Sequence, residues 1–228
     1  MAEKKSVQKI ILRAGSSDVE AKKSHFLGEL RSVGSEEEAR AFIEEVRKKH
    51  YDARHHCFAM RIGTPGSVFE RSGDDGEPQG TAGKPMLEIL KGAALYDVCA
   101  VVTRYFGGTL LGTGGLVRAY SDSLKEALLD SELAEVVSGI LMRIECSYSL
   151  AEKIRRAAQN QGIHILKEEY GAECALHCLM RENEADSFRK KVTELSNGSV
   201  TPETTGTVLF ADGEKPLLYG PLPGGEKT

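Results

Sequence analysis

The sequence lacks any long apolar run, and none of its hydrophobic stretches approaches the roughly 20 residues that a membrane-spanning helix needs. Residues 1–9 are polar, where a secretory signal would carry an apolar segment. We therefore expect a cytoplasmic protein with no membrane association. The five cysteines are an odd number scattered through apolar runs, which predicts reduced thiols and no disulfide framework.

A basic excess is also missing. Lys and Arg number 30 against 34 Asp and Glu, so the formal net charge is −4. Proteins that bind nucleic acid without sequence preference usually carry a clear excess of basic residues. We therefore expect no DNA binding, and any contact with RNA must come from a local patch.

Motifs of well-known catalytic sites are absent as well. No Gly-x-Ser-x-Gly, Cys-x-x-Cys or His-Glu-x-x-His pattern occurs. Gly112 and Gly114 are followed by Val117 where a dinucleotide fingerprint needs its third glycine. The phosphate-loop pattern fails too, because Pro78 stands at its first glycine and Pro85 replaces the Ser or Thr after the lysine. Nucleotide hydrolysis of the usual kind is therefore disfavoured.

What is present is an ordinary globular composition, 40% hydrophobic and 28% charged, in a chain of 228 residues. That length fits one large domain or two small ones. In residues 1–137, turn-rich residues 15–18 separate two strand-like stretches, and Ser35 with Glu38 forms a capping box before a helical face. Residues 53–62 then alternate as a strand with two different faces.

The pattern restarts near Gly139. Residues 138–211 read in the order β-α-β-β-α-β, which predicts a second, ferredoxin-like domain. Residues 212–228 are rich in Gly and Pro, and we expect a flexible tail there.

Residues 74–128 carry most of the motifs. An acidic turn leads to a small-residue loop and a helix, and an apolar strand then leads to a glycine-dense loop and a second helix. Glycine-dense loops are costly in backbone entropy, so they indicate positive φ angles or close backbone approach.

Several ungapped stretches occur in a fixed order: Asp52-Ala-Arg-His-His-Cys57, Asp74-Asp75-Gly-Glu-Pro, Gly80-Thr-Ala-Gly-Lys-Pro85, Arg104-Tyr-Phe-Gly-Gly108 and Leu111-Gly-Thr-Gly-Gly-Leu-Val-Arg118-Ala-Tyr. Together they resemble the bacterial, two-domain members of the YigZ/IMPACT family. The resemblance implies an α+β fold, with an N-terminal domain like a small-subunit ribosomal protein and domain IV of elongation factor G. The C-terminal half is similar to the ferredoxin-like domain V of that factor.

The loop 107–115 joins a strand to a helix N-terminus, where free N–H groups and the helix dipole favour an anion. Flanking basic residues could pair with phosphate. We therefore predict an anion or RNA-backbone contact formed by Lys84, Arg104, Gly107, Gly108, Gly112, Gly114, Gly115 and Arg118. The alternative is that the glycines only permit a tight strand-to-helix connection.

The acidic loop, Asp74, Asp75 and Glu77, offers the oxygen ligands that a hard divalent cation prefers. A solvated turn is favoured, because no carboxylate at a fixed spacing completes a metal site. Ion pairing with Arg54, Lys84 or Arg104, which would order the loops around a shared groove, is a third alternative.

Candidates of second rank are Arg54, His55, His56 and Thr81. Strand alternation puts His55 and His56 on opposite faces, so too few ligands converge for zinc. We expect no metal and no cofactor.

The family resemblance supplies no catalytic residues, and its eukaryotic members resemble regulators of translation that bind a partner of the amino-acid-starvation kinase. We therefore expect a non-enzymatic protein that contacts RNA, the ribosome or a translation factor and modulates translation or a stress response. The alternatives are a Mg-dependent enzyme acting on a phosphorylated small molecule, and a regulator that docks a protein on the same surface.

Overall fold

The structure, a computed structural model, describes residues 8–213 and 215–219. It has a mixed α+β fold in two compact units, Met1–Glu135 and Val136–Thr228. The sequence placed the boundary after residue 137, and the two units divide two residues earlier, inside the same strand β7, Glu132–Cys146. A strand that continues through a boundary gives no turn or change of composition to mark it.

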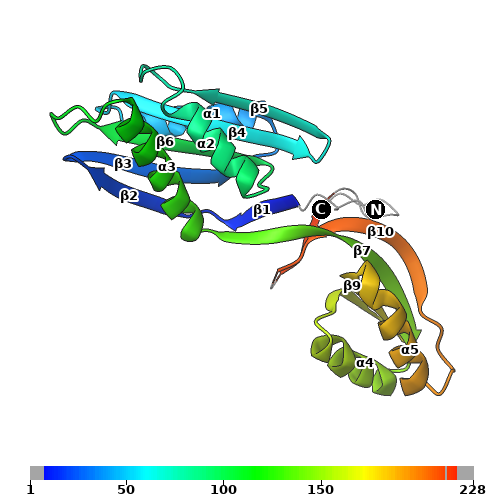
Figure 1. Ribbon diagram of the computed structural model, residues 1–228. Coiled ribbons are helices and arrows are strands. Elements are labelled where there is room, and N and C mark those ends of the chain that lie inside the picture. The colour runs from blue at the N-terminus through cyan, green and yellow to red at the C-terminus, as the bar shows by residue number, and fades with distance from the viewer. Residues whose placement is uncertain (1–7, 214, 220–228) are drawn as a thin grey trace. The chain divides into compact units, whose positions relative to one another are not determined.

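Unit 1 is built on a five-stranded antiparallel sheet in the order β2-β3-β6-β4-β5 (Figure 1). Its elements are β1 Gln8–Arg13, β2 Ser16–Ala21, β3 Ser24–Ser32, α1 Glu36–Lys49, β4 His55–Thr64, β5 Ser67–Gly73, α2 Gly83–Gly92, β6 Val98–Tyr105 and α3 Thr113–Leu129.

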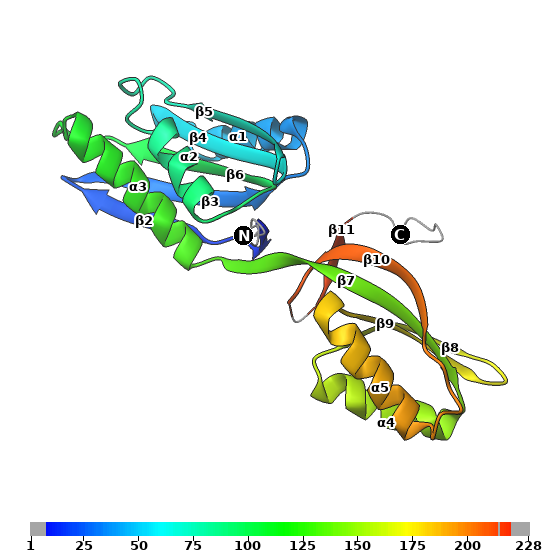
Figure 2. The ribbon, with the colours of Figure 1, turned by 45° about the vertical axis from the view of Figure 1, so that its right-hand side comes forward.

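Helices cover both faces of this sheet, with α1 on one side and α2 and α3 on the other (Figure 2). The central strand β6 is therefore buried from Val98 to Arg104. Alternate residues of β4 divide between the two cores, since Cys57 and Ala59 pack with α2 and α3 while Met60 packs with α1. The two faces predicted for this strand are confirmed.

Unit 2 has the predicted β-α-β-β-α-β order, with its strands arranged β10-β7-β9-β8. This is the split βαβ motif of ferredoxin-like domains. After β7 come α4 Tyr148–Asn160, β8 His164–Tyr170, β9 Cys174–Arg181, a 3-10 turn Glu182–Glu184, α5 Ala185–Leu195, β10 Glu203–Ala211 and β11 Leu217–Tyr219. Within the described ranges, no helix of either unit combines the length and apolar character needed to cross a membrane.

Two expectations about local structure need correction. The turn expected over residues 15–18 is strand β2 from Ser16 onward, and the chain reverses instead at Lys22 and Lys23. The segment 212–228 contributes strand β11, which pairs antiparallel with β10 through Leu218 and Phe210. Residues 214 and 220–228 of the expected tail lie outside the described residues.

Candidate functional site

The motif residues of unit 1 gather at one end of its sheet. The registers pair His25 with Tyr105, His55 with Arg104 and Phe58 with Gly73, so β3 and β4 begin where β5 and β6 end. Four connections therefore meet at this edge: 22–23, 50–54, 74–82 and 106–112. We call this edge and its connections the loop end, which lies at the left of unit 1 in Figure 1.

Asp74 is the internal cap of the loop that precedes α2. Its carboxylate accepts backbone N–H groups of Gly80 at 2.8 Å, Ala82 at 3.0 Å and Gly83 at 2.8 Å. The N-cap residue Ala82 has no side chain that could do this, so Asp74, at the start of the same loop, satisfies these donors. Burial alone raises the pKa of the Asp74 carboxyl, but the three donors outweigh it and hold the pKa below its ordinary value.

Replacing Asp74 with Asn should lower the free energy of unfolding at neutral pH by about 1–3 kcal/mol, because an amide cannot accept all three N–H groups. The pKa of Asp74 is depressed by folding, so its stabilisation is present above the unfolded-state pKa and is lost as pH falls through the folded-state pKa. Urea unfolding at a series of pH values should show wild-type and variant converging in acid. The exposed Asp122→Asn is the matched control, and an equal difference at every pH would contradict this role of Asp74.

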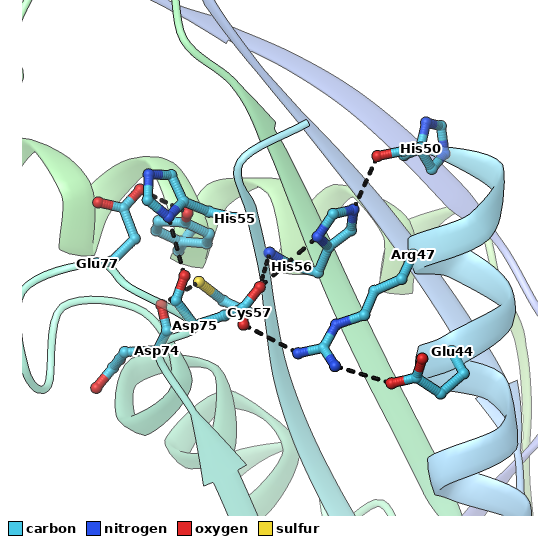
Figure 3. A network of polar contacts seen from close by, with 10 residues as sticks. Glu44, Arg47, His50, His55, His56, Cys57, Asp74, Asp75 and Glu77 are labelled. Atoms are coloured by element: carbon cyan, nitrogen blue, oxygen red, sulfur yellow. Dashed lines mark hydrogen bonds and ion pairs between the residues drawn. The ribbon is translucent and has the colours of Figure 1, made fainter. Parts of the chain in front are cut away.

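Asp75 ties the acidic loop to α1 and β4 (Figure 3). One carboxylate oxygen accepts from Arg47 Nη2 at 2.9 Å and the other from the His56 backbone N–H at 2.7 Å. The Asp75 carbonyl accepts from His55 Nδ1 at 2.9 Å, and His56 Nε2 donates to the His50 carbonyl at 3.0 Å. His55 and His56 therefore hold loops in place.

Glu77 forms a buried ion pair with Arg104. Glu77 Oε1 lies 2.7 Å from Arg104 Nη1 and 2.8 Å from the Tyr120 hydroxyl, and the two charged side chains are 4% and 6% exposed. The Arg104 guanidinium also lies 5.4 Å from the ring centre of Phe26. Burial, reinforced by Cys57 and Glu77, raises the pKa of Tyr120, so its hydroxyl is a neutral donor to Glu77.

These contacts revise the interpretation of the acidic loop. The expected turn is present, since the Glu77 N–H donates to the Asp74 carbonyl at 2.9 Å. Its side chains are not left to solvent, because all three carboxylates accept hydrogen bonds from the protein. Ion pairing with Arg104, offered as an alternative, is found at Glu77. Among the described residues, no three His, Cys, Asp or Glu side chains come together in a way that could hold a metal ion. A magnesium ion on this loop would have to displace the protein's own donors.

The structure separates the predicted anion-binding residues into two layers. Arg104, placed on the surface by the prediction, is buried, and Thr81 is also buried with its hydroxyl donating to the Pro78 carbonyl at 2.7 Å. Lys84, Arg118 and Arg54 are exposed, and within the described part of the chain none of them pairs with a carboxylate.

The glycines of the loop 107–115 are under different structural constraints. A Cβ on Gly107 would lie 2.0 Å from the backbone of Lys23, and Gly108 and Gly112 have φ of 81° and 74°. Gly114 has neither constraint, because nothing lies within 4 Å of its Cβ position and its φ is not positive. Glycine in a helix costs about 1 kcal/mol relative to alanine, so Gly114 weakens α3 without a packing benefit. Close approach of a ligand to this backbone would explain it.

Sequence reasoning missed two contributors to the loop end. Lys22 and Lys23 form the two-residue turn between β2 and β3, both with positive φ, and Lys22 Nζ donates to the Leu110 carbonyl at 3.4 Å. Tyr120 is the second contributor. Nothing in the sequence indicated its hydroxyl contact to Glu77, because that partner is 43 positions away.

These features define a two-domain α+β protein. At the loop end of unit 1 the acidic motif residues are bound by groups of the protein itself, and basic side chains and the glycine-rich backbone are exposed. A model of the Impact N-terminal domain matches residues 22–128, and a model of a domain of unknown function, DUF1949, matches residues 144–199. An IMPACT family member from Bacillus subtilis, YvyE, is 38% identical over 188 residues, which cover 82% of this chain and 86% of that protein. The chain belongs to the IMPACT family.

Other relatives agree in both domains. An IMPACT family member from Haemophilus influenzae is 39% identical over 180 residues, covering 78% of this chain and 87% of that protein. A solved crystal structure of a hypothetical protein is 35% identical, with a TM-score of 0.55, and the match covers 88% of this chain and 98% of that one.

Proposed function

We propose that this protein is a non-enzymatic regulator in the cytoplasm that binds the translation apparatus and contacts RNA backbone through its loop end. Membership of the IMPACT family supports this, since the resemblance of the motifs implies regulators of translation among the eukaryotic members. The domain shapes that the resemblance implies are shared with ribosome-bound proteins, but fold alone does not specify function. The proposed function must therefore rest on the residues of the loop end.

The observation that carries the proposal is the charge separation at the loop end. Asp75 and Glu77 are paired with Arg47 and Arg104, and Asp74 is turned toward backbone N–H groups, whereas the basic side chains around them stay exposed: Lys22, Lys23, Arg54, Lys84 and Arg118. The first turn of α3 adds its own field, because it has no side-chain cap and no acidic residue. A local basic patch on a protein of net charge −4 suits a specific phosphate contact.

The test is co-sedimentation with purified ribosomes across a salt series. Wild-type protein should bind less tightly as salt rises, and the double variant Lys84→Ala, Arg118→Ala should bind more weakly with a salt slope reduced by about 1 per lost phosphate contact. The matched control is Arg40→Ala, Lys125→Ala, which removes the same charge from exposed positions away from the loop end. Absence of binding at low salt, or equal loss in both double variants, would refute the proposal.

A protein partner on the same surface is the second candidate function. Leu110 is 80% exposed and Phe106 is 46% exposed, both in the connection between β6 and α3. Exposed apolar side chains grouped beside basic ones are typical of protein docking sites. We expect Leu110→Ser to leave salt-dependent ribosome binding unchanged if the contact is to phosphate. A variant that lost binding without any change in salt slope would favour the protein partner.

A further inference from the structure

Two of the free cysteines oppose each other across strands of unit 2. Cys146 is the last residue of β7, Cys174 is the first of β9, and the antiparallel register pairs them directly. Directly opposed residues project from the same face, and both thiols belong to the core under α4 and α5. Opposed Cα atoms in antiparallel sheets lie about 4.5–5.5 Å apart. That separation falls within the range of about 4.4–6.8 Å that disulfides span.

The pair lies at the rim of its sheet. Both residues are strand termini, and Cys174 follows the exposed turn 171–173 that joins β8 to β9. Ends of strands open locally at much lower free energy than the centre of a sheet. The thiols are 2% and 0% exposed in the closed structure, so a small oxidant would have to reach them through such openings.

We propose that hydrogen peroxide oxidises Cys146 and Cys174 to a reversible disulfide within unit 2. As the S–S bond forms, the two thiols give up two protons and two electrons. Hydrogen peroxide accepts both as its O–O bond breaks, and two molecules of water are released. A dithiol reductant reverses the reaction by thiol–disulfide exchange.

Reactivity of the pair depends on the thiolate, which is the attacking species. Burial raises the pKa of the Cys146 thiol, and the neighbouring Cys174 and Glu173 add to this effect. Little thiolate is therefore present at neutral pH, and oxidation should be slow there. The rate should increase as pH rises toward the pKa of the thiol.

The experiment treats the full-length reduced protein with hydrogen peroxide, blocks remaining thiols with iodoacetamide under denaturing conditions, and maps the peptides by mass spectrometry. The expected product is an intramolecular link between the peptides of Cys146 and Cys174. It should be removed by dithiothreitol, form faster at higher pH, and be absent in Cys174→Ser. Cys178→Ser is the matched control, because Cys178 is a buried thiol of the same strand and core and should leave the link intact.

The wild-type measurement decides the proposal even if either variant folds poorly. A free-thiol peptide in the same tube shows that the peroxide is active. With that peptide oxidised, equal alkylation of Cys146 and Cys174 before and after treatment would overturn the proposal. A link that joins other cysteines or two protein molecules would do so as well.

Discussion

Replacing Arg104 with Met should lower the free energy of unfolding by about 3–5 kcal/mol, because the variant leaves the Glu77 carboxylate buried without its cation. The loss of stability comes from leaving one buried charge without a partner, so removing both charges should lower the free energy of unfolding much less than removing one. In the double variant Arg104→Met, Glu77→Gln, the Tyr120 hydroxyl still has an oxygen to which it can donate. Urea unfolding of the wild type, both single variants and the double variant measures this coupling.

The exposed pair of Lys125 and Asp122 is the matched control. These side chains are 58% and 45% exposed, and Lys125→Met should change stability by no more than about 1 kcal/mol. The result also distinguishes two roles for Arg104. If Arg104 contacted phosphate as the sequence suggested, its variant would keep normal stability and lose ribosome binding, which is the opposite of what the buried pair predicts.

The fold was predictable where one local pattern dominated. The Ser35 hydroxyl accepts from the Glu38 N–H at the start of α1, as the capping box indicated. The element order of unit 2 followed from hydrophobic periodicity and turn residues. The turn at Lys22 and Lys23 gave no signal, because two-residue hairpins with positive φ are usually recognised by Asn-Gly or similar pairs.

The candidate site was less predictable than the fold, for a physical reason. A sequence shows which residues are charged, but exposure depends on contacts made across the sheet. Arg104 and Arg118 flank the same glycine loop, yet one is buried against Glu77 and the other is exposed. Asp74 likewise looked like part of a turn, and only the fold brings it under the N–H groups before α2.

The second large effect is expected at Gly107. A Cβ on this residue would lie 2.0 Å from the backbone C and O of Lys23 and 2.4 Å from the backbone N of Ser24. No flexible side chain can move aside to relieve these contacts, so Gly107→Ala must displace the tip of the β2–β3 hairpin or the loop itself. We expect a loss of about 3 kcal/mol, at the upper end of the usual range for overpacking, in urea unfolding. A decrease in the free energy of unfolding below about 1 kcal/mol would mean that the β2–β3 turn and the loop after β6 do not restrain each other.

Gly114→Ala provides the contrast within the same loop end. Its Cβ meets nothing within 4 Å, so alanine should stabilise α3 by up to about 1 kcal/mol. The same change should weaken ribosome binding if backbone phosphate approaches the first turn of α3, because the new methyl group would stand between them. A more stable variant that binds less tightly would identify Gly114 as a functional position. A variant that is more stable and binds normally would assign the glycine no role in binding and place any phosphate contact on the exposed basic side chains.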